Sequence, residues 1–148
     1  METLKLMPFQ LSDQLEVKRL ILAGLVEHWG FLDETKNPDL DDIATSYAGA
    51  TFLVGRLGTR IVGTGALLSR SNETAEIVRM SVAKELRQHG IGRQILQALL
   101  AQAQAQGFRQ VILETTTSWS EVVAFYLRCG FQITHYLDGD VYFARDIP

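Results

Sequence analysis

The sequence predicts a mixed α/β (α+β) fold, with one mostly antiparallel sheet of about six or seven strands, about four helices and one parallel crossover. Two observations lead to this prediction. Between residues 51 and 82, β-rich segments follow one another across tight turns or a short polar loop, which is typical of an antiparallel meander. From residue 90 onward, helical and strand patterns alternate, which indicates a crossover to a parallel strand. We expect a single domain over residues 1–148.

The first part of the chain predicts a strand, a helix and a polar stretch. The strand covers Leu4–Phe9, and the helix is expected to begin near Ser12 or Asp13. Five apolar residues are expected to form the buried face of this helix: Leu15, Leu20, Ile21, Leu22 and Leu25. The segment from Glu27 to Asp42 is polar and irregular.

The rest of the chain divides into clear elements. Gly58-Thr59 forms a tight turn between the first two strands of the meander, and Gly107 ends a long helix whose exposed face is rich in glutamine. The predicted strands are Thr51–Leu57, Arg60–Leu68, Ala75–Val82, Val111–Thr115, Phe131–Tyr136 and Val141–Asp146, and the predicted helices are Gly90–Gln106 and Glu121–Arg128.

Composition excludes several classes of protein. The net charge of -3 argues against nucleic acid as a main partner, because phosphate backbones need a basic face. The single cysteine, Cys129, rules out an intramolecular disulfide and a cysteine-based metal cluster, and we expect no metal. The N-terminus has no signal-peptide pattern, and no apolar run reaches the length of a membrane span. We therefore expect a cytoplasmic protein that binds no membrane.

One turn carries most of the chemical information, since it joins a strand directly to the long helix. The first amides of a helix lack intrahelical partners and lie at the positive end of its dipole, so they bind phosphate readily. Two glycines let an anion approach the backbone, and basic side chains add donors. The residues of this candidate anion site are Arg87, Gln88, His89, Gly90, Ile91, Gly92 and Arg93.

Alternatives to this anion site are less well supported by the residues. No P-loop pattern exists in the chain, and Ile95 stands where a dinucleotide fingerprint needs its third glycine. The alternative to an anion site is that the turn is only a helix N-terminus, whose glycines allow the chain to turn and the helix to pack.

The same residues resemble a known family. Arg87-x-x-Gly90-x-Gly92, between a strand and a helix, resembles the acetyl-CoA signature of the GNAT superfamily of N-acetyltransferases. The segment Ala124–Phe131, which contains Phe125-Tyr126 and Gly130-Phe131, is similar to its second landmark, and the order of elements agrees. The resemblance therefore covers nearly the whole chain and implies a GNAT-like fold.

The resemblance also implies a co-substrate and its contacts. Amides from Arg87 to Gly92, with Arg93, would hold the pyrophosphate of acetyl-CoA, and Met80, Ser81 and Val82 would line the acetyl site on a strand edge that pairs with the pantetheine arm. Many members carry an asparagine where this chain has Trp119. Either a flanking serine hydroxyl (Ser118 or Ser120, of which Ser120 is our candidate) replaces that arm contact, or the contact is absent.

Attack by an amine on a thioester requires a base, because an alkyl ammonium with a pKa of about 10.4 is mostly protonated at neutral pH. Glu76 is our candidate, since strand alternation would place it on the same side as Met80 and Val82; the alternative is an exposed charge. The resemblance implies that Tyr126 is the general acid, and the alternative is a core tyrosine. The N–H of Val82 is a candidate oxyanion donor, and Cys129 is interpreted as a small buried residue rather than a nucleophile.

The acceptor is expected to be a primary amine of a small molecule or peptide. Six acids between residues 27 and 42 would attract a cationic amine, although they could equally be solvated caps and turns: Glu27, Asp33, Glu34, Asp39, Asp41 and Asp42. Asp39 or Asp41 is also expected to cap a short helix through Ile43–Tyr47. Trp29 and Phe31 are either pocket aromatics or core. The sequence leaves open a homodimer, and also a non-catalytic acyl-CoA-binding or regulatory module as the alternative function.

Overall fold

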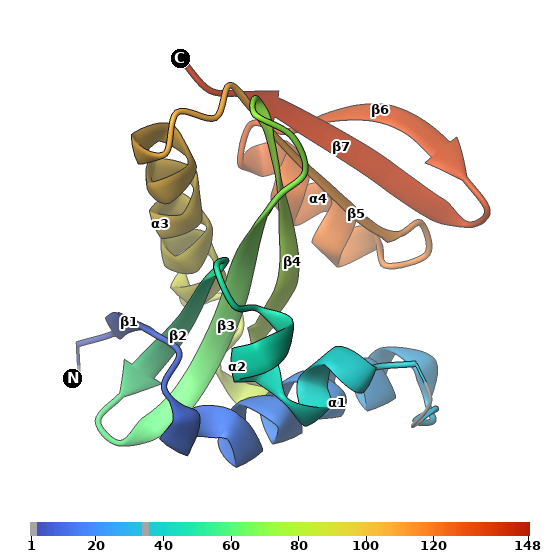
Figure 1. Cartoon of the computed structure of the whole chain (residues 1–148). Coiled ribbons are helices and arrows are strands. Elements are labelled where there is room, and N and C mark those ends of the chain that lie inside the picture. Colours follow the sequence, from blue (N-terminus) through green and yellow to red (C-terminus); the bar gives the residue numbers. More distant parts are fainter. Residues whose placement is uncertain (1–2, 34–35) are drawn as a thin grey trace.

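Seven strands form one sheet in the order β1-β2-β3-β4-β5-β7-β6 (Figure 1). The computed structural model describes residues 3–33 and 36–148. The strands are β1 (Lys5–Pro8), β2 (Thr51–Leu57), β3 (Arg60–Ser69), β4 (Thr74–Val82), β5 (Gln110–Thr116), β6 (Gln132–Leu137) and β7 (Asp140–Asp146). Among these strands β4 and β5 form the one parallel pair, and all other pairs are antiparallel. The predicted fold class is confirmed.

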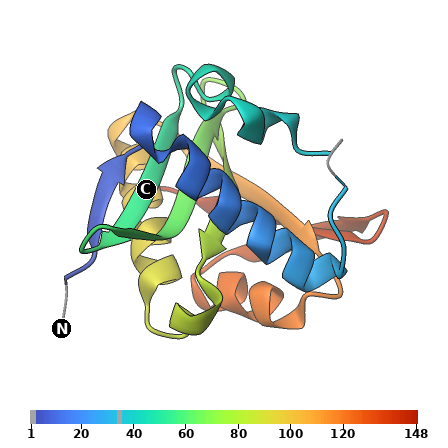
Figure 2. The ribbon, with the colours of Figure 1, turned by 90° about the horizontal axis from the view of Figure 1, so that it is seen from below.

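Helices cover both faces of this sheet. The α-helices are α1 (Gln14–Trp29), α2 (Ile43–Ser46), α3 (Ile91–Ala105) and α4 (Ser120–Arg128), with 3-10 turns at η1 (Leu11–Asp13), η2 (Pro38–Asp41) and η3 (Lys84–Leu86). One buried cluster lies between the sheet and α1 with α2, and the other lies between the sheet and α3 with α4. Seen from below, α1 crosses the sheet and ends near α4 (Figure 2).

Helix α1 differs from the sequence prediction in two ways. It continues to Trp29, beyond the expected irregular start at Glu27, because Gly30 adopts φ +76° and donates its N–H to the carbonyl of Val26 at 2.7 Å. The expected buried residue Leu15 is 59% exposed, whereas Val17 is fully buried. Val17 and Ile21 are four residues apart and form the buried face, from which Leu15 points away.

The helix caps also correct the prediction. Helix α1 does begin after Asp13, but the carboxylate of Asp13 accepts hydrogen bonds from Arg56 and the N–H of Gln10 rather than capping the helix. Asp42 caps α2 by accepting from the N–H of Thr45 at 3.2 Å, so the expected caps Asp39 and Asp41 are wrong. Asp41 pairs with Lys18 at 2.5 Å, and Asp39 belongs to the site described below.

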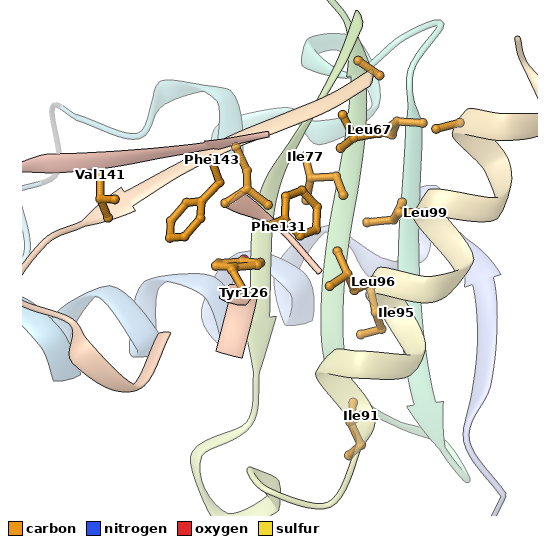
Figure 3. Close-up of a cluster of buried hydrophobic side chains, with 14 of the residues drawn as sticks. Leu67, Ile77, Ile91, Ile95, Leu96, Leu99, Tyr126, Phe131, Val141 and Phe143 are labelled. Carbon is orange, nitrogen blue, oxygen red and sulfur yellow. The ribbon is translucent and has the colours of Figure 1, made fainter. Parts of the chain in front are cut away.

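The larger buried cluster holds α3 and α4 against the sheet (Figure 3). Ile91, Ile95 and Leu99 project from one face of α3, at intervals of four residues. Gly63 and Gly65 of β3 allow this helix to approach closely, since a Cβ at either position would lie 2.6 to 2.9 Å from side-chain atoms of α3 or β4. This packing fixes the start of α3 beside the end of β4.

Candidate functional site

The strands β4 and β5 are paired at three positions and then diverge. The pairs are Thr74↔Gln110, Ala75↔Val111 and Glu76↔Ile112. Beyond Glu76, β4 stays paired with β3 as far as Val82, and β5 stays paired with β7 as far as Thr116. Across the resulting gap, the facing edges of these two strands have no strand partner among the described residues.

A β-bulge in β4 lies beside this gap. Ser81 stands opposite Thr64, whereas Val78 stands opposite Ala66, so β4 has one residue more than β3 between these pairs. Arg79, at the bulge, adopts φ +56°, and the hydroxyl of Thr64 donates to its carbonyl oxygen at 2.8 Å.

The bulge shows that one prediction is wrong: Glu76 does not share a side with Met80 and Val82. Met80 and Val82 pack against the cluster of α3 and α4, whereas Val78 packs against the cluster of α1 and α2. Glu76 shares the side of Val78, since the two are separated by one residue within regular strand. The extra residue in the bulge shifts the alternation of faces by one, so every later side chain of β4 changes sides.

The backbone of β4 supplies a donor to the gap. The N–H of Ala83 donates to the carbonyl of Val62 at 2.8 Å, and so points toward β3. In an antiparallel pair, successive residues direct their backbone groups to opposite edges, so the N–H of Val82 points toward the gap. The predicted oxyanion donor therefore faces the open edge of β4.

The predicted anion-binding turn follows η3. Gly90 is the N-cap of α3 with φ +82°, and Gln88 also adopts a positive φ, +66°. In the part of the chain that the structure describes, the amides of residues 88–93 have no acceptor outside the helix. Several free backbone N–H groups at the N-terminus of α3 are suited to bind a phosphate group, because a phosphate binds where such groups lie at the positive end of a helix dipole.

The side chains of this turn are less uniform than its amides. Arg87 donates through Nη1 to Glu27 of α1 at 2.7 Å and through Nε to the carbonyl of Val82 at 3.3 Å. His89 is exposed, and its Nδ1 lies 2.8 Å from the carbonyl of Arg87. Arg93 is exposed on the first turn of α3. The predicted donors therefore lie in the same turn, but the guanidinium of Arg87 is already paired with Glu27 of α1.

Tyr126 lies in the buried cluster on α4. Its side chain is 6% exposed, and its ring centre lies 5.9 Å from that of Phe131 and 5.7 Å from that of Phe143 (Figure 3). Burial raises the pKa of Tyr126 above its usual value, so the phenol stays protonated at neutral pH. Burial likewise raises the pKa of Cys129, which disfavours its thiolate.

Glu76 lines a pocket of about 370 Å³ on the side of the sheet that carries α1 and α2. Arg70 donates to the carboxylate of Glu76 at 2.6 Å, and the side chain of Glu76 is 13% exposed. The polar residues that line the pocket are Asp39, Tyr47, Arg70, Glu76, Arg79 and Glu114. The pocket opens where β4 and β5 separate, because Glu76 belongs to their last pair.

An ionic network forms one wall of this pocket. Arg79 donates to Asp39 at 2.7 Å, and the hydroxyl of Tyr47 donates to Asp39 at 2.6 Å. Burial raises the pKa of Asp39, but the hydrogen bonds from Arg79 and Tyr47 outweigh it and lower the pKa below its usual value. Burial and the hydrogen bond to Asp39 raise the pKa of Tyr47 to about 12. The network ties η2 and α2 to the bulge of β4.

Comparisons with known proteins identify this arrangement. The sequence model of the acetyltransferase (GNAT) family matches residues 17–131. The chain belongs to this acetyltransferase family. It is 32% identical over 122 residues to N-acetyltransferase 8B of Rattus norvegicus, covering 76% of this chain and 54% of that protein, so the chain spans about half the length of the curated relatives it matches.

Solved structures of the GNAT family share the whole fold. A GNAT acetyltransferase of Staphylococcus aureus Mu50 superposes with a TM-score of 0.86 at 22% identity, covering 97% of this chain and 99% of that one. The PaiA N-acetyltransferase of Thermoplasma acidophilum, in complex with coenzyme A, superposes with a TM-score of 0.86 at 16% identity, covering 98% and 99%. The GNAT-like fold expected from the resemblance is confirmed.

The remaining predictions meet the structure in different ways. Ser120 is the exposed first residue of α4, and Trp119 packs against α1. Of the six acids expected to attract an amine, Glu27, Asp39 and Asp41 form ion pairs and Asp42 caps α2, while Glu34 lies outside the described residues. Trp29 and Phe31 are exposed and thus lie outside the core.

Sequence reasoning missed the partners that shape the site. Tyr47, Arg79 and Glu114 were not among the predicted site residues, and Asp39 was predicted only as one of six acids near the acceptor. The one available signal for their network was an arginine in the middle of a predicted strand. Among the described residues, no group of histidine, cysteine or acidic side chains is placed to hold a metal ion. In the same residues, no helix combines the length and apolar composition that a membrane span requires.

Proposed function

We propose that this protein is an acetyl-CoA-dependent N-acetyltransferase that acetylates a primary amine of a small molecule or peptide by direct attack. The observation that carries the proposal is the divergence of β4 from β5 beside the amides of residues 88–93. An extended ligand with a phosphate at one end can lie along the open edge of β4 and place its phosphate at the start of α3. Coenzyme A has this shape and charge, and it is bound in the Thermoplasma relative.

When bound, acetyl-CoA supplies an acetyl group on a thioester, and transfer to an amine forms an amide and releases a thiol. The amides of residues 88–93 would bind the pyrophosphate, with help from Arg93. Met80, Ser81 and Val82 would line the acetyl site at the edge of β4, where the N–H of Val82 is a fixed donor for developing negative charge.

Two side chains would move protons. Glu76 would accept a proton from the amine, directly or through water, because its carboxylate lines the pocket at the last β4–β5 pair. Tyr126 would hold a proton at its phenolic oxygen for the leaving thiol, and the raised pKa keeps that proton in place across the neutral range. The acceptor would enter from the side of α1 and α2, opposite the side chains of Met80 and Val82.

A calorimetric titration with acetyl-CoA, with ATP and NADH as controls, tests the first half of the proposal. Selective binding of acetyl-CoA is expected, and equal binding of all three or of none would contradict it. A thiol-release assay with a panel of amines tests the second half. Acetyl-CoA binding without thiol release for any amine or peptide in the panel would favour the non-catalytic module, which would also keep Tyr126 as a core residue.

A further inference from the structure

Arg79 occupies a position in the β4 bulge that would suit a glycine. Its φ of +56° lies in the left-handed region, which is unfavourable for residues with a Cβ. A bulge that needs such a conformation usually has a glycine there, because glycine adopts a positive φ without strain. The hydroxyl of the fully buried Thr64 donates to the carbonyl of Arg79 at 2.8 Å, but this bond does not depend on the arginine side chain.

The side chain of Arg79 is bound to the segment before α2. Its Nε and Nη2 donate to the two carboxylate oxygens of Asp39 at 3.0 and 2.7 Å, and Nη2 also donates to Asn37 at 3.1 Å. A bidentate pair of this kind fixes the orientation of the guanidinium as well as its position. The hydroxyl of Tyr47, at the end of α2, donates to the same carboxylate at 2.6 Å. The arginine side chain is only 19% exposed, so solvent screens the pair less than it screens a surface pair.

Asp39 is itself held on a fixed support. Its neighbour Leu40 is fully buried, and the side chain of Gln14 on α1 donates to the carbonyl of Leu40 at 2.7 Å. The same side chain accepts a hydrogen bond from the N–H of Ile43, the first residue of α2, at 3.0 Å. Ile43 is fully buried as well. The network therefore connects the bulge to a segment that buried contacts and hydrogen bonds hold in place.

The bulge determines where Val82 points. Faces and edges alternate together along a strand, so one extra residue reverses both for every residue that follows. Without the bulge, the side chain of Val82 would lie on the same side as Glu76, and its N–H would point toward β3 instead of the gap. The bulge therefore directs the candidate oxyanion donor to the open edge and leaves Glu76 on the other face, in the pocket.

We propose that Arg79 and Asp39 are positioning residues, which hold the strained bulge and thereby keep the N–H of Val82 directed into the gap. This inference rests on the proposed function. Without the network, a residue with a Cβ would remain at positive φ and the strain would no longer be offset, so a fraction of the molecules would lose the bulge. The donor would be misplaced in that fraction, and turnover would fall while the phosphate-binding turn stays intact.

Two substitutions at one position test this proposal, because alanine and glycine both remove the guanidinium but differ in strain. Thiol release is measured with the amine that the unaltered protein acetylates fastest. Arg79→Ala keeps a Cβ at φ +56°, so its kcat should fall about tenfold. Arg79→Gly relieves the strain, so its kcat should return to within about threefold of the unaltered value. Both variants lose the same part of the pocket wall, so the KM for the amine should change equally.

Two further measurements do not depend on turnover. Acetyl-CoA affinity in calorimetry should stay within about threefold of the unaltered value in both variants, because the phosphate-binding turn is unchanged. The midpoint of urea denaturation should be higher for Arg79→Gly than for Arg79→Ala, although glycine within a regular strand is ordinarily the less stable of the two.

A double-mutant cycle tests the part of Asp39. Asp39→Asn should lower kcat about fivefold in the unaltered protein and have no further effect in Arg79→Gly, where the network is already absent. Asp138 provides the matched control, since it is exposed in the turn between β6 and β7 and also adopts a positive φ, +51°. Asp138→Ala and Asp138→Gly should differ in stability in the same direction and leave kcat unchanged.

The outcomes distinguish this inference from the proposed function. Equal losses of kcat in Arg79→Ala and Arg79→Gly would overturn the positioning role and indicate that the guanidinium acts directly on the acceptor. A lower denaturation midpoint for Arg79→Gly than for Arg79→Ala would overturn it as well, whether or not the protein is an enzyme. Absence of thiol release from the unaltered protein with every amine would overturn the proposed function and, with it, this inference.

Discussion

The two edges of β4 differ in how far they are paired with a neighbouring strand, although they belong to the same nine residues. Toward β3, the strand is paired from Ala75 to Val82, with one bulge. Toward β5, the pairing ends at Glu76. An unpaired strand edge is usually a liability that proteins cover or blunt. Here the paired edge holds the fold together, and the open edge leaves backbone groups without a strand partner. Under the proposed function, these groups would bind an extended ligand.

The largest expected effect comes from the turn at the end of the open edge. Gly90→Val should weaken acetyl-CoA binding about a hundredfold, because a β-branched residue at φ +82° strains the backbone by about 1–3 kcal/mol or changes the turn. Calorimetry measures the affinity, and circular dichroism checks the fold.

A matched control lies at the other end of the same helix. Gly107 has φ +85°, and a Cβ there, as at Gly90, would meet nothing within 4 Å. Gly107→Val should therefore cost similar stability and leave acetyl-CoA affinity unchanged. Equal losses of affinity in both variants would mean that strain in α3, rather than the turn, explains the effect.

The second prediction concerns Glu76, where the two edges begin to differ. Glu76→Gln should lower turnover about a hundredfold at neutral pH if this carboxylate is the base. The deficit should shrink as pH rises, because more of an amine with a pKa of about 10.4 is then already neutral. Thiol release measured from pH 7 to pH 9.5 checks this.

Glu114→Gln is the control for that experiment, since Glu114 lines the same pocket from β5. It should leave the shape of the pH profile unchanged. If Glu114→Gln altered the pH profile and Glu76→Gln did not, the general base would be Glu114 of β5 rather than Glu76 of β4.

The sequence predicted the paired edge and the turn much better than the open edge. Strand alternation and the pattern of strand, glycine and helix are local signals, so the order of elements and the turn at Gly90 could be predicted. The bulge leaves no such signal, because Arg79 is not a glycine and yet adopts a positive φ. A single extra residue therefore moved Glu76 to the other face, which alternation alone could not anticipate.

Contacts between distant segments were also beyond the sequence. Glu27 and Arg87 are sixty residues apart, and Asp39 and Arg79 are forty apart. The sequence around Glu27 or Asp39 does not indicate which arginine each acid pairs with, because acids in a polar stretch are usually solvated. Both pairs connect the α1–α2 region to β4, and they became visible only when the fold brought these segments together.

The third prediction concerns the paired edge. Gly65→Ala should lower the free energy of unfolding by about 1–3 kcal/mol, because the added Cβ would lie 2.6 Å from the sulfur of Met80 and 2.8 Å from a methyl carbon of Ile95. Urea denaturation measures the change. Gly92→Ala is the control: its Cβ would make contacts of 3.5 Å or more, so stability should stay unchanged or rise slightly.

The smallest expected effect concerns the bulge that separates the two edges. Asp39→Asn should lower the free energy of unfolding by about 1 kcal/mol at pH 7, because it weakens the ion pair with Arg79 while the side chain of Asp39 is 30% exposed. The pKa of Asp39 is lowered in the folded protein, so its contribution is present above the unfolded pKa of about 3.9 and is lost as pH falls through the folded pKa. Urea denaturation should therefore show the two proteins converging below about pH 4. Asp41→Asn, in the exposed pair with Lys18, should change stability by less than about 0.5 kcal/mol at either pH. Equal effects of the two substitutions would mean that the network at Arg79 does not stabilise the bulge more than an ordinary surface pair does.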